Sequence, residues 1–320
     1  MGYTVECIGD QRSHELRDLC RGKRLYNAKA DINGICVQLL TEDREIVRMW
    51  NDNFYHMSDK VRAHAMLYCI SDESCPMHVE YDIESSILFL FNFDYYGWIK
   101  SIALGVAGNI LEDAHGIHPV HGAVLDVDGE GVTLIAPSKT GKTTQSWGLL
   151  RLPNTRLISD DWYFVSFGRG APMVSGSEKN CYIDADIGDV WSEYRELVEQ
   201  VRFDNRGRGI GNVRWVAGSD AMAEHTSVKH IILLKRDPSD QAVERELGAE
   251  EALAYLEAND FCNPHQLVRN QNRVDRRRDF FRRYLSECTV HMVNTIRPAE
   301  ETQAIIRKAI GRGENEERFR

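Results

Sequence analysis

A hydrophobic run that ends in a small-residue loop constrains the fold of this chain more than any other stretch. The segment "TLIAPSKTGKTTQSW" occupies residues 133–147, and its Lys-Thr-Thr triplet opens a segment with helical spacing. A strand, a loop and a helix in this order can bind phosphate, because backbone N–H groups and the helix N-terminus converge on its oxygens. The alternative is an ordinary junction with a chance Gly-Lys-Thr sequence. The strand before the loop, the helix after it and paired acids downstream favour phosphate binding.

The loop itself, "APSKTGKT" at 136–143, fits the phosphate-loop pattern when alanine is allowed at the first position. Lys142 is then expected to reach the outer phosphates, and Thr143 to offer its hydroxyl to Mg²⁺. Ala136 and Lys139 replace glycines that are often found in such loops, and Lys139 either points into solvent or adds charge near the phosphates. The expected nucleotide-binding residues are Pro137, Ser138, Lys139, Thr140, Gly141, Lys142, Thr143 and Thr144.

The segments around this loop predict a mixed sheet. "HGAVLDV" at 121–127 and "VTLIA" at 132–136 flank a "DGEG" turn and indicate a hairpin that leads into the loop. An antiparallel partner directly upstream differs from the parallel βαβ arrangement of the common phosphate-loop fold. Further strands are expected at 156–159, 162–167, 228–237 and 289–295, and helices at 143–150, 248–259, 273–287 and from Pro298 to Ile310.

The first hundred residues indicate a separate, β-rich unit. Strands are expected at 3–9, 34–40, 44–50, 78–83 and 85–91, the last two as a hairpin. Helical spacing over Trp98–Glu112 predicts a helix that links this unit to the rest of the chain. We therefore expect two domains, 1–97 and 98–320.

The composition excludes some classes of function. A net charge of −10 over 320 residues argues against a protein whose main partner is nucleic acid or an anionic membrane. The longest apolar stretch, "SILFLFNF" at 86–93, is far shorter than the roughly 20 residues that span a bilayer, and the start lacks the pattern of a signal peptide. The eight cysteines show no zinc-like spacing, so reduced thiols and a cytoplasmic location are expected.

Four residues outside the loop have side chains suited to phosphate chemistry. Asp160 and Asp161 stand between two predicted strands. A bare Asp-Asp pair is usually a solvated turn. About 20 residues after such a loop, however, the pair suits the roles of metal ligand and general base. His121, judged by spacing alone, is more often a core or surface residue. Arg206 lies in a Gly-Arg cluster that is either an ordinary loop or a source of guanidinium groups for phosphate. The arginines at 276–283 predict a solvated helix face.

Residues 121–165 resemble the catalytic core of HPr kinase/phosphorylase and its relatives, whose nucleotide domain is similar to ATP-dependent phosphoenolpyruvate carboxykinase. The shared elements are His-Gly, a strand pair, a loop that ends in Gly-Lys-Ser/Thr, and Asp-Asp after a strand. "DNRGRGIGNV" at 204–213 also resembles a later segment of the family, Glu-x-Arg-Gly-x-Gly-Ile, with Asp204 in place of the glutamate. The resemblance implies a mixed-sheet nucleotide-binding α/β domain preceded by a smaller β-rich α+β domain.

The resemblance also implies roles for single residues, with ATP and Mg²⁺ as cofactors. Lys142 would contact the phosphates, and His121 and Arg206 would belong to the active site. Asp160 and Asp161 would share the base and metal roles, which the sequence does not divide between them. The implied metal ligands are Thr143, Asp161 and Asp204.

These observations predict a kinase that moves the γ-phosphate of Mg·ATP to a hydroxyl, with a seryl hydroxyl of a protein or peptide as the leading acceptor. A small-molecule hydroxyl is the first alternative, and a non-catalytic ATP-sensing module is the second. The first hundred residues do not resemble the regulatory domain of bacterial HPr kinase, so the resemblance does not extend to HPr as substrate, to phosphorylase activity or to hexamers. The sequence leaves homo-oligomerisation open.

Overall fold

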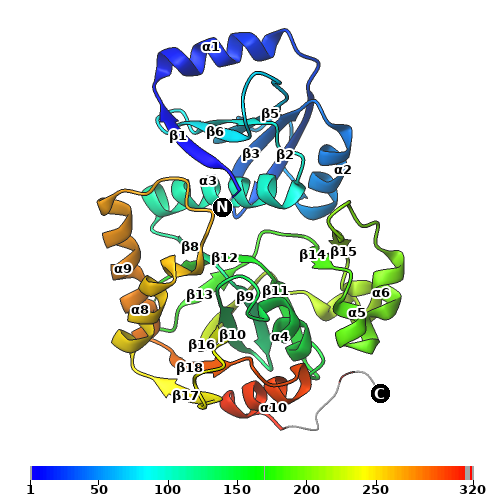
Figure 1. The fold of residues 1–320 in the computed structure, drawn as a ribbon, viewed down its shortest axis with the longest axis vertical. Helices are drawn as coiled ribbons and strands as arrows, with labels where there is room; N and C mark the ends of the chain where they lie inside the picture. Colours follow the sequence, from blue (N-terminus) through cyan, green and yellow to red (C-terminus); the bar gives the residue numbers. More distant parts are fainter. Residues whose placement is uncertain (1, 169, 314–317, 319–320) are drawn as a thin grey trace. The chain divides into compact units, whose positions relative to one another are not determined.

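The structure, a computed structural model, has a mixed α/β fold and describes residues 2–168, 170–313 and 318 (Figure 1). The chain divides into two compact units. The first runs up to Gly116 and includes two later segments, Ser177–Asn180 and Pro264–Arg269, and the second contains the rest. Within the described residues, no helix is both long and apolar enough to cross a membrane.

The first unit contains a seven-stranded mixed sheet in which β3, β5 and β7 are parallel neighbours. The predicted hairpin at 78–91 is confirmed, since β6 and β7 pair antiparallel. In sheet order the strands are β1 (Thr4–Ile8), β6 (His78–Asp82), β7 (Ile87–Phe91), β5 (Ala65–Ile70), β3 (Ile35–Thr41), β2 (Tyr26–Ile32) and β4 (Tyr55–His56). The helices are α1 (Asp10–Arg21), α2 (Arg44–Asn53) and α3 (Tyr96–His115).

The strand predicted at 44–50 is wrong, because these residues belong to helix α2. Ile46, Met49 and Trp50 are buried at helical spacing, so one face of the helix packs inward. Asp43 caps its N-terminus by accepting a hydrogen bond from the Glu45 N–H at 2.7 Å. The β-branched and aromatic residues that suggested a strand therefore form the inner face of a capped helix.

Helix α3 belongs to the first unit, so this unit extends past residue 97. Its residues from Ile99 to Gly108 are all buried. Lys100 lies among them, and its Nζ is 3.0 Å from Oε1 of Glu178, with side-chain exposures of 1% and 2%. The same oxygen accepts a hydrogen bond from Asn53 Nδ2 at 2.9 Å. This buried ion pair holds the segment Ser177–Asn180 in the first unit.

We expect Glu178→Ala to lower the free energy of unfolding by about 3–5 kcal/mol, because it leaves the Lys100 ammonium buried without its counter-charge. Urea unfolding checks this, with the exposed Glu196→Ala on α6 (Arg195–Gln200) as a control that should change little. Combining Lys100→Met with Glu178→Leu should recover most of the loss, since no buried charge remains. Equal stability of Glu178→Ala and the wild type would contradict this account.

The second unit is built on a nine-stranded mixed sheet, and the predicted mixed orientation is confirmed. Strand β10 pairs antiparallel with β9 upstream and parallel with β16. The strands are β8 (His118–His121), β9 (Ala123–Val127), β10 (Glu130–Ile135), β11 (Thr155–Ser159), β12 (Trp162–Ser166), β13 (Met173–Ser175), β16 (His225–Lys235), β17 (Glu244–Leu247) and β18 (Thr289–Asn294). A separate two-stranded sheet pairs β14 (Cys181–Asp184) with β15 (Arg208–Gly211).

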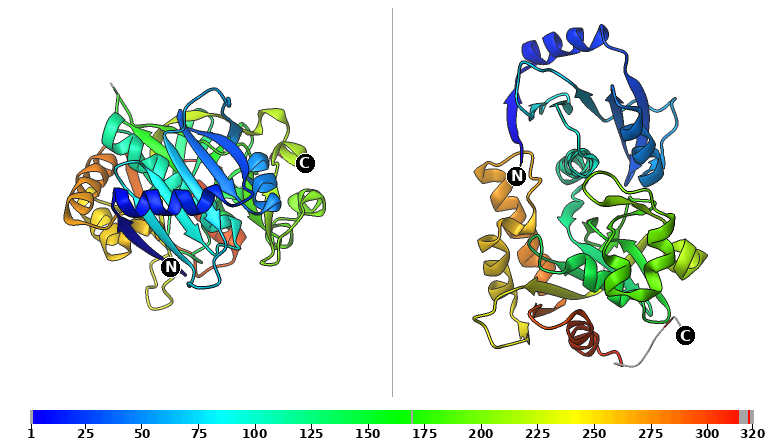
Figure 2. Two further views of the ribbon diagram at one scale, coloured as in Figure 1. Left: turned by 90° about the horizontal axis from the view of Figure 1, so that it is seen from above. Right: turned by 45° about the vertical axis from the view of Figure 1, so that its right-hand side comes forward.

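Helices cover both faces of the larger sheet, and the predicted helices are confirmed (Figure 2). Leu125 of β9 points to the face that packs Trp147 and Ile306, whereas its neighbour Val124 points to the face that packs Leu253 and Phe281. This alternation follows from the period of two in a strand. The first face is covered by α4 (Lys142–Leu149) and α10 (Ala299–Ala309), and the second by α8 (Ala249–Ala258) and α9 (Gln271–Ser286). The short helices α5 (Ile187–Val190), α6 and α7 (Arg214–Ala217) follow β13 in the chain.

Candidate functional site

Strand directions bring the sequence-predicted residues to one edge of the larger sheet. Strands β10, β11, β16 and β18 run parallel to one another, and β9 runs opposite between β10 and β11. The carboxyl ends of these four strands and the start of β9 therefore meet at the same edge, here called the loop edge. Ligands of α/β sheets commonly bind at the carboxyl ends of strands. The segments at the loop edge are Asp160–Asp161, His121–Gly122, the 136–141 loop, Arg236 and Thr295.

The 136–141 loop has the backbone geometry of a tight turn into a helix. Gly141, at the N-cap of α4, has φ +93°, a left-handed conformation that glycine adopts without steric cost. Thr140 is buried and its hydroxyl donates to the Pro137 carbonyl at 2.7 Å. Thr143 and Thr144 lie in the first turn of α4, where backbone N–H groups have no partner inside the helix. The loop therefore presents several N–H groups at the loop edge.

Lys139 is also left-handed, with φ +67°, and its side chain is exposed. Of the two interpretations of this residue, the exposed side chain fits the solvent-facing one. A flexible lysine in this position still adds positive charge to the loop.

Asp161 is where three groups of the loop edge meet. Its Oδ1 accepts a hydrogen bond from Lys142 Nζ at 2.8 Å and lies 3.1 Å from His121 Nε2. The other ring nitrogen of His121, Nδ1, lies 2.6 Å from the Cys262 carbonyl oxygen. Because a carbonyl oxygen only accepts, Nδ1 carries a hydrogen and donates it. The Asp161 carbonyl accepts from the Gly122 N–H at 2.8 Å, which fixes the two backbones together. The structure thus joins Lys142, Asp161 and His121, including the histidine that spacing alone disfavoured.

Asp160 and Asp161 differ in exposure. Asp160 is only 4% exposed, and its carbonyl lies 3.4 Å from Lys142 Nζ. The Asp161 side chain is 27% exposed, so a substrate can reach its carboxylate more readily.

A left-handed turn that the sequence analysis missed positions His121. Asp260, Phe261 and Cys262 have φ values of 51°, 52° and 53°, which cost non-glycine residues roughly 1–2 kcal/mol each. The buried Phe261 ring stacks on Phe281 with centroids 5.6 Å apart, and this packing offsets the strain. No glycine marks this turn, so no local signal in the sequence could have predicted it. Backbone strain of this kind often occurs at functional sites.

The Gly-Arg segment forms its own turn, capped by Asp204. Oδ1 of Asp204 accepts the backbone N–H groups of Arg206 at 2.8 Å and Arg208 at 3.0 Å, and Oδ2 accepts from the Tyr182 hydroxyl at 2.8 Å. Both carboxylate oxygens are thus engaged locally, which does not support the expected metal role of Asp204. The Arg206 side chain is exposed.

The remaining donors fit a magnesium ion that is bound together with phosphates. No cluster of three His, Cys, Asp or Glu side chains suited to a metal ion occurs among the described residues. Mg²⁺ does not need such a cluster, since it commonly takes one or two carboxylates, water and substrate phosphate oxygens. The Thr143 hydroxyl and the carboxylates of Asp160 and Asp161 are oxygen donors of this type.

Two further residues of the loop edge, Arg236 and Thr295, were not predicted. The Thr295 hydroxyl donates to the Thr140 carbonyl at 2.8 Å, and Arg236 Nε donates to the Thr295 carbonyl at 3.2 Å. Arg236 directly follows β16 and Thr295 directly follows β18. Their place beside the loop depends on the parallel pairing of β10, β16 and β18, which single-strand patterns do not specify.

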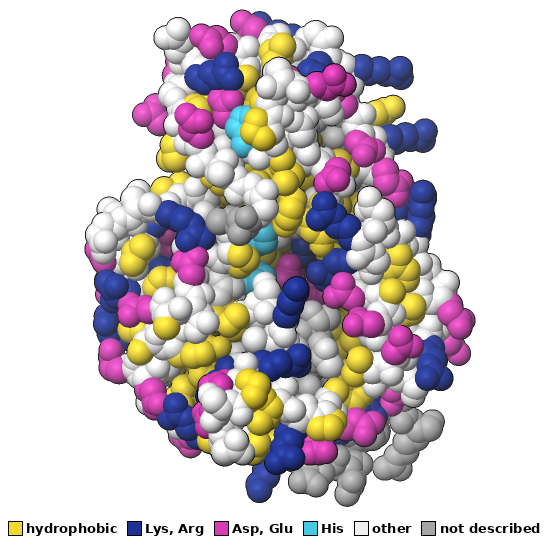
Figure 3. Space-filling model, in the orientation of Figure 1, with side chains coloured by type: hydrophobic (Ala, Val, Ile, Leu, Met, Phe, Trp, Pro, Cys, Tyr) yellow, Lys and Arg dark blue, Asp and Glu magenta, His cyan; other side chains and the backbone are white. Residues whose placement is uncertain are grey.

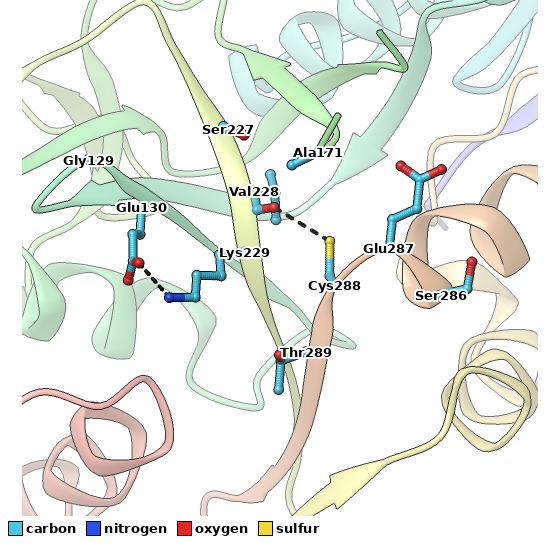
Figure 4. Close-up of a pocket in the computed structure, with 10 residues that line it drawn as sticks. All are labelled: Gly129, Glu130, Ala171, Ser227, Val228, Lys229, Ser286, Glu287, Cys288 and Thr289. Carbon is cyan, nitrogen blue, oxygen red and sulfur yellow. Dashed lines mark hydrogen bonds and ion pairs between the residues drawn. The ribbon is translucent and has the colours of Figure 1, made fainter. Parts of the chain in front are cut away.

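A cavity of about 400 Å³ lies at the opposite edge of the sheet, where β16 and β18 begin (Figure 4). Glu130 and Lys229 form an ion pair there, and the Cys288 thiol donates to the Val228 carbonyl. Burial raises the pKa of Cys288 to about 12, so this thiol stays protonated and unreactive at neutral pH. None of the site residues predicted from the sequence lines this cavity, so the candidate site is the loop edge.

Charges of both signs are interspersed on the molecular face drawn in Figure 3, so that face presents no extended basic surface. No family model matches the sequence, and no curated protein matches it either. The function is therefore inferred from the residues of the loop edge.

Proposed function

We propose that this chain is a cytoplasmic kinase with a nucleotide domain like that of HPr kinase and phosphoenolpyruvate carboxykinase, and that it transfers the γ-phosphate of Mg·ATP to a hydroxyl. One observation carries the proposal: Asp161 Oδ1 lies within 3.1 Å of both the loop lysine, Lys142, and His121. Phosphoryl transfer to a hydroxyl uses a cation that neutralises the phosphate and a carboxylate that accepts the hydroxyl proton, and the two must lie close together.

The loop edge supplies each part of the reaction. Backbone N–H groups of the 136–141 loop and the first turn of α4 bind the phosphates, and Lys142 neutralises the outer ones. Mg²⁺, when bound, neutralises phosphate charge, with Thr143 and the Asp160–Asp161 pair as donors. The acceptor oxygen bonds to the γ-phosphorus, the bond to the bridging oxygen of ADP breaks, and the hydroxyl proton moves to Asp161.

The contact between Lys142 and Asp161 connects phosphate binding to the base. The Lys142 ammonium and the Asp161 carboxylate neutralise each other across 2.8 Å. Triphosphate competes for the ammonium because it carries several negative charges, and it thereby frees Asp161 Oδ1 for the acceptor hydroxyl. His121 donates from Nδ1 to the Cys262 carbonyl, so it holds the carboxylate across 3.1 Å as an imidazolium, with a second hydrogen on Nε2.

A seryl hydroxyl of a protein or peptide is the proposed acceptor, by analogy with the family that residues 121–165 and 204–213 resemble. The engagement of Asp204 in its own turn favours one other candidate, an ATP-sensing module whose transfer activity is lost. Nucleotide binding does not separate the two functions, whereas phosphate transfer does.

The test is transfer of labelled γ-phosphate from Mg·ATP into an extract of the source cells, followed by separation by size. We expect label in macromolecules with the wild type and none above background with the double variant Asp160→Asn, Asp161→Asn. Label in the small-molecule fraction instead would move the acceptor to a metabolite. If the wild type binds ATP but transfers no label beyond that seen with the double variant, the kinase function is excluded and the sensor is favoured.

A further inference from the structure

The charge of Arg236 at the loop edge has no role in the function proposed so far. Strand β16 ends at Lys235, and its Leu233 pairs with Ile135, the last residue of β10. The residue after β16 therefore lies beside the loop after β10. A Cβ built on Gly141 would be 3.8 Å from Nη2 of Arg236, so the guanidinium reaches the glycine that precedes Lys142.

The guanidinium is held on one side only. Its Nε donates to the carbonyl and the hydroxyl oxygen of Thr295 at 3.2 and 3.3 Å. The Thr295 hydroxyl in turn donates to the Thr140 carbonyl of the loop at 2.8 Å. This chain of contacts fixes Arg236 to the loop through the end of β18. Its two outer nitrogens make no hydrogen bond within the part of the chain that the structure describes, and they remain for a ligand.

Neighbouring acids do not neutralise this arginine. The Asp237 carboxylate accepts from the Ser239 N–H and hydroxyl at 2.9 and 2.6 Å. The Asp240 carboxylate pairs with the Lys235 ammonium. An exposed guanidinium whose outer face is open suits bidentate recognition of phosphate oxygens.

Strand order decides which phosphates the arginine can meet. Across the loop edge the order is β11, β9, β10, β16 and β18. Asp161 follows β11 on one side of the loop, and Lys142 Nζ points to it. Arg236 follows β16 on the other side. The transferred phosphate belongs on the Asp161 side, so Arg236 faces the phosphates that stay on the nucleotide.

We propose that Arg236 is a binding residue for the α- and β-phosphates, and that it recognises the diphosphate part common to ADP and ATP. This assignment rests on the proposed nucleotide-binding function. It predicts that the affinities for product ADP and for donor ATP both depend on Arg236. Lys142 and Asp161, in contrast, act at the transferred phosphate.

The experiment is calorimetric titration of the whole chain with Mg·ADP and Mg·ATP, comparing the wild type with Arg236→Gln. Loss of a charge-assisted hydrogen bond should weaken both affinities by about tenfold or more, and by similar factors. Arg245→Gln is the matched control, because Arg245 is exposed on β17 and pairs with Glu251. This control should bind both nucleotides like the wild type. Equal melting temperatures without nucleotide would show that the variants are folded.

Each other result has a distinct meaning. Unchanged ADP affinity in Arg236→Gln would overturn the assignment while leaving the kinase proposal intact. A loss for ATP alone would also overturn it, because the arginine would then act at the γ-phosphate. A wild type that binds neither nucleotide would overturn the proposed function, and the role of Arg236 with it.

Discussion

Replacing Lys142 with methionine is expected to slow phosphate transfer by a factor of about a hundred to a thousand, because the transferring phosphate loses its principal side-chain cation at the loop edge. Methionine keeps most of the length of the side chain and its packing. The Lys142 ammonium lies 2.8 Å from Asp161, so the substitution removes charge at the point where the acceptor must approach. Initial rates of labelled product at saturating Mg·ATP measure the effect.

Lys139→Met is the matched control for this prediction, since it removes the same charge from the 136–141 loop, just before α4. Its side chain is exposed, so we expect a rate within a few-fold of the wild type. Full activity in Lys142→Met would show that the Gly-Lys-Thr sequence is a chance junction. An equal loss in Lys139→Met would show that the rate depends on the total charge of this region and not on Lys142 itself. Thermal unfolding of both variants checks that neither rate reflects a folding defect.

The loop and its flanking strands could be predicted from the sequence because the signals are local. Val124 and Thr133 pair in the hairpin on either side of a Gly-containing turn, and turn chemistry specifies such pairs. The order of strand, loop and helix at 133–147 likewise involves only neighbouring residues. Asp160 and Asp161 could be singled out because they follow this unit closely in the chain.

The helix α2 shows how a local signal can mislead. Residues 44–50 contain β-branched and aromatic residues, which favour strands as an average over many proteins. Here Asp43 supplies an N-cap and the hydrophobic residues recur at positions 46, 49 and 50, which suits a helix packed on a sheet. Weighting the capping signal above β propensity would have given the correct element.

Long-range contacts of the site were beyond prediction from the sequence. Cys262 meets His121 across 141 positions in the chain, through a left-handed turn without glycine. Arg236 and Thr295 reach the loop only because β16 and β18 run parallel beside β10. Glu178 lies in the first unit although most of its sequence neighbours lie in the second. Each of these depends on strand order or on burial, which no short pattern specifies.

The second large effect is expected for Asp161→Asn, which should reduce the rate of transfer by a factor of about a hundred to ten thousand, the usual contribution of a general base. Asparagine keeps the shape of the side chain and an oxygen that can accept from Lys142, but it cannot take the proton of the acceptor hydroxyl. The loss should therefore appear in kcat, with little change in the affinity for Mg·ADP.

Asp189→Asn, an exposed aspartate on α5, provides a control for the loss of one negative charge from the same unit. The single variant Asp160→Asn then divides the two roles that the sequence left undivided. If Asp161 is the base, Asp160→Asn should retain a larger share of kcat, because the buried Asp160 carboxylate is less accessible to the acceptor. A wild-type kcat in Asp161→Asn would contradict the mechanism and move the base to Asp160, whereas loss of nucleotide affinity in Asp161→Asn would indicate that this carboxylate acts mainly through the metal.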